Sequence, residues 1–116
     1  MRDYWKTVSV YMILLVLMLL GGMAFGQVQI IHFNADWNSA NNVEWFGKLS
    51  DCDKKYIDIG KDSEAQTKYN IAVVPTIIIF NDGEEIKRFK ADISFTMKAT
   101  RKEVQGIIDE QLMSDF

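Results

Sequence analysis

Few side chains of this chain could act as nucleophiles or metal ligands, and they are scattered along the sequence. Cys52 is the only cysteine and His32 the only histidine among the 116 residues. The carboxylates of Asp51 and Asp53 flank Cys52 and are expected to raise the pKa of its thiol, which disfavours a reactive thiolate. One cysteine and one histidine without ligand spacing predict neither a metal site nor a bound cofactor. A single cysteine also excludes an internal disulfide.

The first 26 residues differ from the rest of the chain. Arg2 and Lys6 precede an almost entirely apolar run from Val8 to Leu20, and the segment ends in Ala24-Phe25-Gly26. A basic start, an apolar centre and a small-x-small end are typical of a signal peptide. Residues 1–26 are therefore predicted to be a signal peptide, cleaved before residue 27.

The alternative for this leader is an uncleaved signal anchor. The run from Val8 to Phe25 nearly reaches the roughly 18 residues that can span a bilayer. Both interpretations place the domain at residues 27–116 outside the cytoplasm, either periplasmic or secreted. Membrane contact is then expected only through residues 8–25, and only if they are retained.

The charge of the remaining chain bears on its partners. Of the 13 basic and 16 acidic residues, two basic and one acidic residue lie in the first 26, so residues 27–116 carry a net charge of −4. Because this part is acidic and has no basic patch, a nucleic-acid partner is not expected.

Short apolar runs predict the strands. Gln27 to Phe33 and Thr76 to Phe80 have the composition of buried strands, whereas Lys55 to Ile59 alternates. Asn81-Asp82-Gly83 separates the second of these runs from Glu84 to Phe89. It predicts a hairpin, because glycine accepts a positive φ.

Three segments favour helices. Asn38 to Leu49 places its apolar residues on one face, although a glycine weakens it. Asp62 or Ser63 can cap a short helix that follows, and the capping box from Thr100 to Glu103 begins a C-terminal helix. The predicted order is strand, helix, strand, helix, strand, strand, helix, which is an α/β fold.

Three motifs together resemble the thioredoxin family. They are Phe33-x-Ala35-x-Trp37, then Val74-Pro75-Thr76, and the hairpin at Asn81-Asp82-Gly83. The resemblance covers about residues 28–113. It implies the minimal thioredoxin-like fold, a mixed four-stranded sheet with helices on both faces, and a cis peptide bond at Val74–Pro75.

The sequence departs from this family at the residues that carry its chemistry. Asn38-Ser39-Ala40-Asn41 stands where a thioredoxin has its redox cysteine pair. An amide cannot attack a disulfide, so disulfide reductase activity of the thioredoxin type is not expected. The stretch from residue 38 to Pro75 is also shorter than in typical thioredoxins, which predicts a truncated first helix.

Other residues near the lost motif have simple interpretations. His32 aligns with the buried acid that helps to move a proton in thioredoxins, and a group titrating near neutral pH could do that work. Without a thiol to serve, a half-buried, hydrogen-bonded histidine is favoured. Asp36 is expected to be a solvated acid. Trp37 aligns with the exposed tryptophan beside the family's cysteines, and Trp45 fits a core position.

The resemblance implies a non-redox binding module. In the family, the main chain beside the cis-proline pairs with an extended peptide, which is a form of strand addition and needs no cysteine. One alternative is a divergent thiol-disulfide oxidoreductase that uses Cys52 or a partner's thiols. Another is a structural domain with a vestigial groove. The candidate peptide-binding residues are Trp37, Asn38, Ser39, Asn41, Val74 and Pro75.

Overall fold

A computed structural model describes residues 28–114, so the predicted leader lies outside the described part of the chain. The elements, in chain order, are β1 (Val28–Asn34), the 3₁₀ helices η1 (Asp36–Asn41) and η2 (Glu44–Lys48), β2 (Asp53–Asp58), α2 (Ser63–Lys68), β3 (Thr76–Asn81), β4 (Glu84–Lys90) and α3 (Arg101–Ser114). None of the helices in residues 28–114 is long and apolar enough to cross a membrane.

The strands form one mixed sheet in the order β2-β1-β3-β4. β1 runs parallel to β2 and antiparallel to β3, and β3 pairs antiparallel with β4. The central strands β1 and β3 are buried almost throughout, which explains their nearly continuous apolar sequence. The edge strands β2 and β4 are mostly exposed and rich in charged residues, which hinders pairing with other chains. The predicted four-stranded α/β sheet is confirmed.

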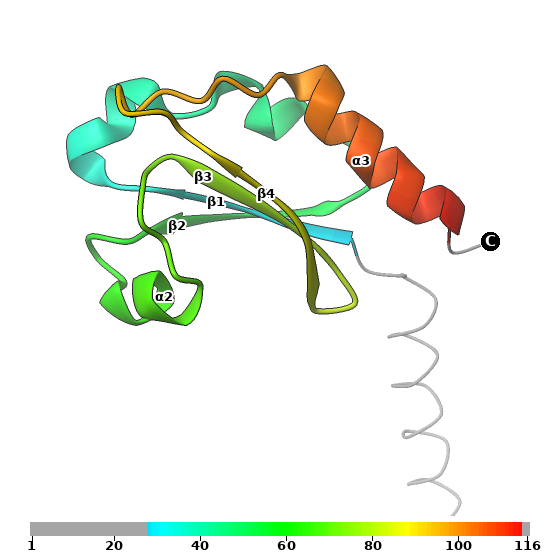
Figure 1. The fold of residues 1–116 in the computed structure, drawn as a ribbon, viewed down its shortest axis with the longest axis horizontal. Helices are drawn as coiled ribbons and strands as arrows, with labels where there is room; N and C mark the ends of the chain where they lie inside the picture. The colour runs from blue at the N-terminus through cyan, green and yellow to red at the C-terminus, as the bar shows by residue number, and fades with distance from the viewer. Residues whose placement is uncertain (1–27, 115–116) are drawn as a thin grey trace, which may run out of the picture.

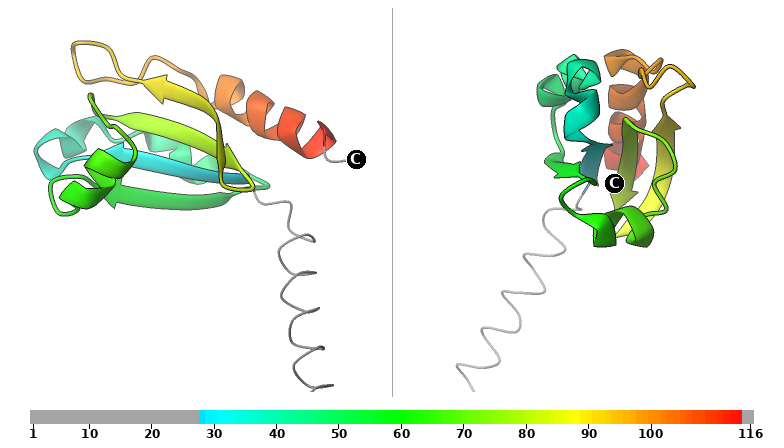
Figure 2. Two further views of the ribbon diagram at one scale, coloured as in Figure 1. Left: turned by 60° about the horizontal axis from the view of Figure 1, so that its bottom comes forward. Right: turned by 90° about the vertical axis from the view of Figure 1, so that its left-hand side faces the viewer.

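Two apolar cores lie on opposite faces of the sheet. Successive side chains of a strand point to opposite faces, so β3 sends Ile77 and Ile79 into one core and Ile78 and Phe80 into the other. The first core packs against η2 and α3, and the second packs against α2 (Figures 1 and 2). Helices therefore cover both faces, as the resemblance implied.

The expected helix from Asn38 to Leu49 is wrong. The segment forms two short 3₁₀ helices, η1 and η2, which are separated by Asn42 and Val43. Asn38 has φ −113° and ψ 18°, and Asn42 has φ −55° and ψ 142°, so neither residue continues a regular helix. Asparagine side chains compete for hydrogen bonds that a helix would make, and this run has an asparagine at each interruption.

The other predicted ends and turns are present. Asp62 caps α2 through a 3.0 Å bond from the Ala65 N–H to its carboxylate. The Glu103 N–H donates to the Thr100 hydroxyl at 3.2 Å, as the first half of a capping box requires. In the β3–β4 turn, residues 82 and 83 have φ of 52° and 83°, the signs that a type I′ hairpin needs.

Candidate functional site

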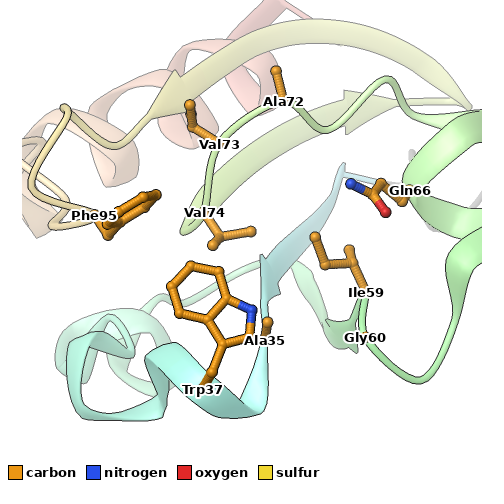
Figure 3. Close-up of a pocket in the computed structure, with 9 residues that line it drawn as sticks. All are labelled: Ala35, Trp37, Ile59, Gly60, Gln66, Ala72, Val73, Val74 and Phe95. Carbon is orange, nitrogen blue, oxygen red and sulfur yellow. The ribbon is translucent and has the colours of Figure 1, made fainter.

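A groove of about 250 Å³ lies at the carboxyl end of β1, where the chain enters β3. The side chains around it come from segments that are far apart in the sequence (Figure 3). Of the six predicted peptide-binding residues, Trp37 and Val74 line this groove. Its lining is mainly apolar and consists of Ala35, Trp37, Ile59, Gly60, Gln66, Ala72, Val73, Val74 and Phe95.

Two aromatic rings form one side of the groove. Trp37 is 68% exposed and Phe95 is 42% exposed, although both are large and apolar. Their rings meet edge to face, with centroids 5.3 Å apart, an arrangement that aromatic pairs favour. Phe95 has φ 60°, a conformation that is uncommon for a bulky residue. Sequence reasoning missed Phe95, because nothing in the sequence around it marks a site.

The main chain of Val74 lies at the floor of the groove. The Val74–Pro75 peptide bond is cis, and both residues are buried. The carbonyls of Val73 and Pro75 accept hydrogen bonds of 2.6 and 3.0 Å from neighbouring groups. The Val74 carbonyl accepts a hydrogen bond from the side-chain amide of Asn38 at 3.5 Å, which is long and weak. A carbonyl oxygen has two lone pairs, so this one can still accept from a guest.

Asn38, at the position of the family's first cysteine, is only 5% exposed and lies beneath the groove. Its Nδ2 donates to Asn34 Oδ1 at 3.1 Å and to the Phe95 carbonyl at 3.2 Å. Its Oδ1 accepts from Asn41 Nδ2 at 2.8 Å. Asn38 and Asn41, both candidate peptide-binding residues, are therefore bonded to each other.

The remaining predicted residues are not grouped around the groove. Ser39 is exposed and does not line it. Asn41 is half-buried and lines a second cavity of about 270 Å³, together with Trp45 and Met97. The structure thus brings Trp37 and Val74 together, adds Phe95, and places the asparagines under or beside this set.

The asparagine network continues into the sheet. Asn34, fully buried at the end of β1, donates to the Asn38 carbonyl at 3.1 Å and to Asn42 Oδ1 at 2.6 Å. The Tyr56 hydroxyl of β2 donates to the same Asn42 oxygen at 2.7 Å. The network satisfies polar groups that are costly to bury unpaired.

His32 lies in the core rather than half-buried as expected, with 1% of its surface exposed. Its Nε2 accepts the Val43 N–H at 3.1 Å, so the neutral ring carries its proton on Nδ1. The ring stacks on Tyr56, with centroids 4.7 Å apart. Burial lowers the pKa of His32 from 6.5 to about 4. The hydrogen-bonded interpretation fits these contacts, and a group titrating near neutral pH does not.

Cys52 is remote from the groove. It precedes Asp53, which pairs with Gln29 at the start of β1, whereas the groove lies beyond the other end of that strand. Gln29 and Asn34, near the two ends of β1, are five residues apart, which corresponds to roughly 16 Å along a strand. Burial, and then the charges of Asp53 and Asp51, raise the pKa of the Cys52 thiol, while Lys54 opposes the shift. A reactive thiolate is therefore disfavoured at this position.

Asp36 is a solvated acid, as expected. Its carboxylate lies 3.2 Å from Lys61 Nζ, and both side chains are about three-quarters exposed. A hydrogen bond from Lys61 lowers the pKa of Asp36. Exposed pairs of this kind contribute little to stability. Within residues 28–114, no group of three or more histidine, cysteine or acidic side chains could hold a metal ion.

Several solved structures with a similar fold are thioredoxins. Reduced thioredoxin pre-protein of Schistosoma mansoni is 23% identical, with 82% of this chain and 88% of that chain covered and a TM-score of 0.60. Thioredoxin 1 of Thermosipho africanus is 24% identical, with 73% and 94% covered and a TM-score of 0.55. A mutant thioredoxin of Halobacterium salinarum is 21% identical, with 74% and 75% covered and a TM-score of 0.59.

No protein-family model and no curated protein sequence matches the chain. The likeness to the solved structures establishes the thioredoxin-like fold. The single cysteine means that this example of the fold has no redox cysteine pair.

Proposed function

We propose that this domain binds an extended segment of a protein partner in the groove beside Val74 and Pro75, and does so without redox chemistry. The observation that carries the proposal is the groove itself. An exposed aromatic pair, Trp37 and Phe95, stands beside the main chain of Val74 at the end of the central strands (Figure 3). Exposed aromatic side chains of this size are typical of interaction sites.

The chemistry of the groove suits a peptide better than a small polar molecule. An extended segment can pair its main chain with free backbone groups at a sheet end, and it gains affinity from those bonds and specificity from pockets for its side chains. The Val74 carbonyl supplies one such group, because its only bond from the described residues is long. Between Trp37 and Ile59, the apolar lining supplies the pocket.

Replacing Trp37 with alanine is expected to weaken peptide binding at least about 10-fold, because aromatic anchors at the centre of an interface dominate its affinity. The probe is a set of peptides selected from a phage-displayed random library against the full-length chain. Affinities for wild type and variant are measured by fluorescence anisotropy of the labelled peptides.

Met113→Ala is the matched control for this experiment. Met113 is 74% exposed, similar to Trp37, but it lies near the end of α3. Its truncation should leave affinity within about twofold, as for a side chain outside the interface. If no peptide is selected, the groove is vestigial and the domain is structural. If Trp37→Ala binds the selected peptides as well as wild type, they bind elsewhere and the proposed site is wrong.

The chain is expected to show no insulin reduction by dithiothreitol above the uncatalysed rate. The reason is that amides occupy both redox positions, Asn38 and Asn41, and Cys52 has a raised pKa and lies elsewhere. Turbidity of insulin reports the reaction. Activity that is clear in the wild type and lost in Cys52→Ser would contradict a non-redox function and favour the oxidoreductase alternative.

We also propose that the domain acts outside the cytoplasm. This rests on the sequence of residues 1–26, whose basic start and apolar centre fit a signal peptide or an anchor. In either case the partner would be a protein of the exported compartment, and a membrane would contact the chain only through residues 8–25.

A further inference from the structure

We propose that Asn38 is the positioning residue of the groove. Its carboxamide joins Asn34, at the end of β1, to the Phe95 carbonyl, beside the Val74 carbonyl, and so holds the groove in one conformation. The effect on binding rests on the proposed function above, whereas the effect on the groove's geometry does not.

Three hydrogen-bond acceptors surround the side-chain nitrogen of Asn38. Asn38 Nδ2 lies 3.1 Å from Asn34 Oδ1, 3.2 Å from the Phe95 carbonyl and 3.5 Å from the Val74 carbonyl. An amide nitrogen has two hydrogens. The two shorter contacts therefore take them, and the Val74 carbonyl shares one of them weakly. Asn38 thus fixes Phe95 firmly and leaves the Val74 carbonyl able to accept from a guest.

The Asn38 carboxamide is held in one orientation. The Phe95 and Val74 carbonyls can only accept hydrogen bonds, so they fix the nitrogen on their side, and Oδ1 then accepts from Asn41 Nδ2 at 2.8 Å. Asn34 donates to the Asn38 carbonyl at 3.1 Å and anchors the main chain at the same place. Asn38 and Asn41 thereby close, with a hydrogen bond, the turn that a thioredoxin's cysteine pair would close.

The segment that Asn38 holds has an unusual main-chain conformation at Phe95. Phe95 has φ 60°, a left-handed conformation that a bulky side chain rarely adopts without support. Asp92 supports it from one side, because its carbonyl accepts the Phe95 N–H at 3.0 Å and its carboxylate accepts the Ser94 N–H at 2.9 Å. Asn38 supports it from the other side. The ring is thereby held edge to face with Trp37.

A cysteine in place of Asn38 would not do this. A thiol is a weak donor with one hydrogen, and it could not reach three acceptors at once. The asparagine is therefore more than the loss of a nucleophile. It supplies the donors that hold the Phe95 segment against the end of β1 before a ligand arrives, which reduces the ordering cost of binding.

The test compares Asn38→Ala with Ser39→Ala, which truncates the exposed neighbour. In the ligand-free, full-length chain, nuclear Overhauser effects between the Trp37 indole and the Phe95 ring report the edge-to-face contact of these two rings. We expect these signals in wild type and in Ser39→Ala, and their loss in Asn38→Ala. Unchanged signals in Asn38→Ala would overturn the proposal.

Asn41→Ala keeps the experiment decisive if Asn38→Ala does not fold. It removes the bond that orients the Asn38 oxygen and leaves the three acceptors of Nδ2 in place. The Trp37–Phe95 signals should weaken in this variant but not vanish. Equal signals in Asn41→Ala and wild type would then count against the proposal.

Binding provides the second readout. Affinity for the phage-selected peptides should fall about 5- to 10-fold in Asn38→Ala, since the Phe95 side chain must then be ordered on binding. Val104→Ala, which destabilises the remote helix α3, should leave affinity unchanged if Asn38 acts by positioning. If both variants lose affinity equally, Asn38 has only a structural role. If wild type binds no selected peptide, the proposed function fails, while the Trp37–Phe95 signals still decide the positioning role.

Discussion

Replacing Phe33 with alanine is expected to lower the free energy of unfolding by about 3–5 kcal/mol, the range for deleting a fully buried aromatic ring. Phe33 is 0% exposed and lies on the central strand β1, between Ile57 of β2 and Thr76 of β3. Its ring packs at 5.1 Å from the ring of Tyr69, in the core beneath α2. The cavity left by alanine would open directly behind the groove.

Urea unfolding at neutral pH measures this change. Phe95→Ala removes the same ring from an exposed position and should cost no more than about 1 kcal/mol, the value of an exposed aromatic pair. Phe33→Leu keeps most of the apolar volume and should fall between the two. A loss below about 1.5 kcal/mol in Phe33→Ala would mean that the core of this face collapses around the cavity, contrary to the packing described above.

The strands could be predicted from the sequence because their signals are local. Val28 to Phe33 and Thr76 to Phe80 are apolar because both faces of their strands are covered, and this leaves a continuous apolar run. The hairpin at Asp82 and Gly83 has a turn type that only a few residues allow. Each of these features depends on residues close together in the chain.

The segment after β1 could not be predicted in the same way. Apolar residues at helical spacing suggested one helix from Asn38 to Leu49, but side-chain hydrogen bonds decide its conformation. Asn38 bonds to Asn34, which is four residues earlier at the end of β1, and to Phe95, 57 residues further along. Helical periodicity does not report such long-range bonds, so the helix was wrong and the two 3₁₀ helices were missed.

Only part of the candidate site could be predicted, because some of its residues are placed by long-range contacts. The family motifs place Trp37 and Val74 at the site, and Asn38 and Asn41 are candidates because they stand where the family has its cysteines. A buried asparagine network has a visible signal, four asparagines between Asn34 and Asn42, which could have suggested that these side chains bond to one another. Phe95 had no comparable signal, because its role depends on the loop after β4 folding over the groove.

His32 is expected to make the domain less stable as the pH falls from about 6.5 to about 4. Burial lowers the pKa of this histidine from 6.5 to about 4 in the folded chain. Between these values the unfolded chain binds a proton that the folded chain does not, so stability decreases with decreasing pH. The difference between the two pKa values of His32 corresponds to about 3 kcal/mol of folding stability, which is fully lost below pH 4.

The structure explains why the folded chain resists this proton. The lone pair of His32 Nε2 already accepts the Val43 N–H at 3.1 Å, and protonation would remove that acceptor. The new charge would also lie in the core, stacked on the Tyr56 ring. Acid is therefore expected first to loosen the contact between β1 and the start of η2, close to the asparagine network that supports the groove.

Urea unfolding of wild type and His32→Gln at pH 7, 5.5 and 4.5 tests this dependence. Glutamine can offer an oxygen to the Val43 N–H but does not titrate. Wild type should lose most of the 3 kcal/mol over this range, and His32→Gln should lose much less, although it starts from a lower stability. The exposed carboxylate of Asp92, whose pKa is lowered to about 2, loses its contribution mainly below this range. If the free energy of unfolding changed with pH equally in the two proteins, His32 would titrate at its ordinary pKa. Its protonation would then not loosen the structure beside the groove.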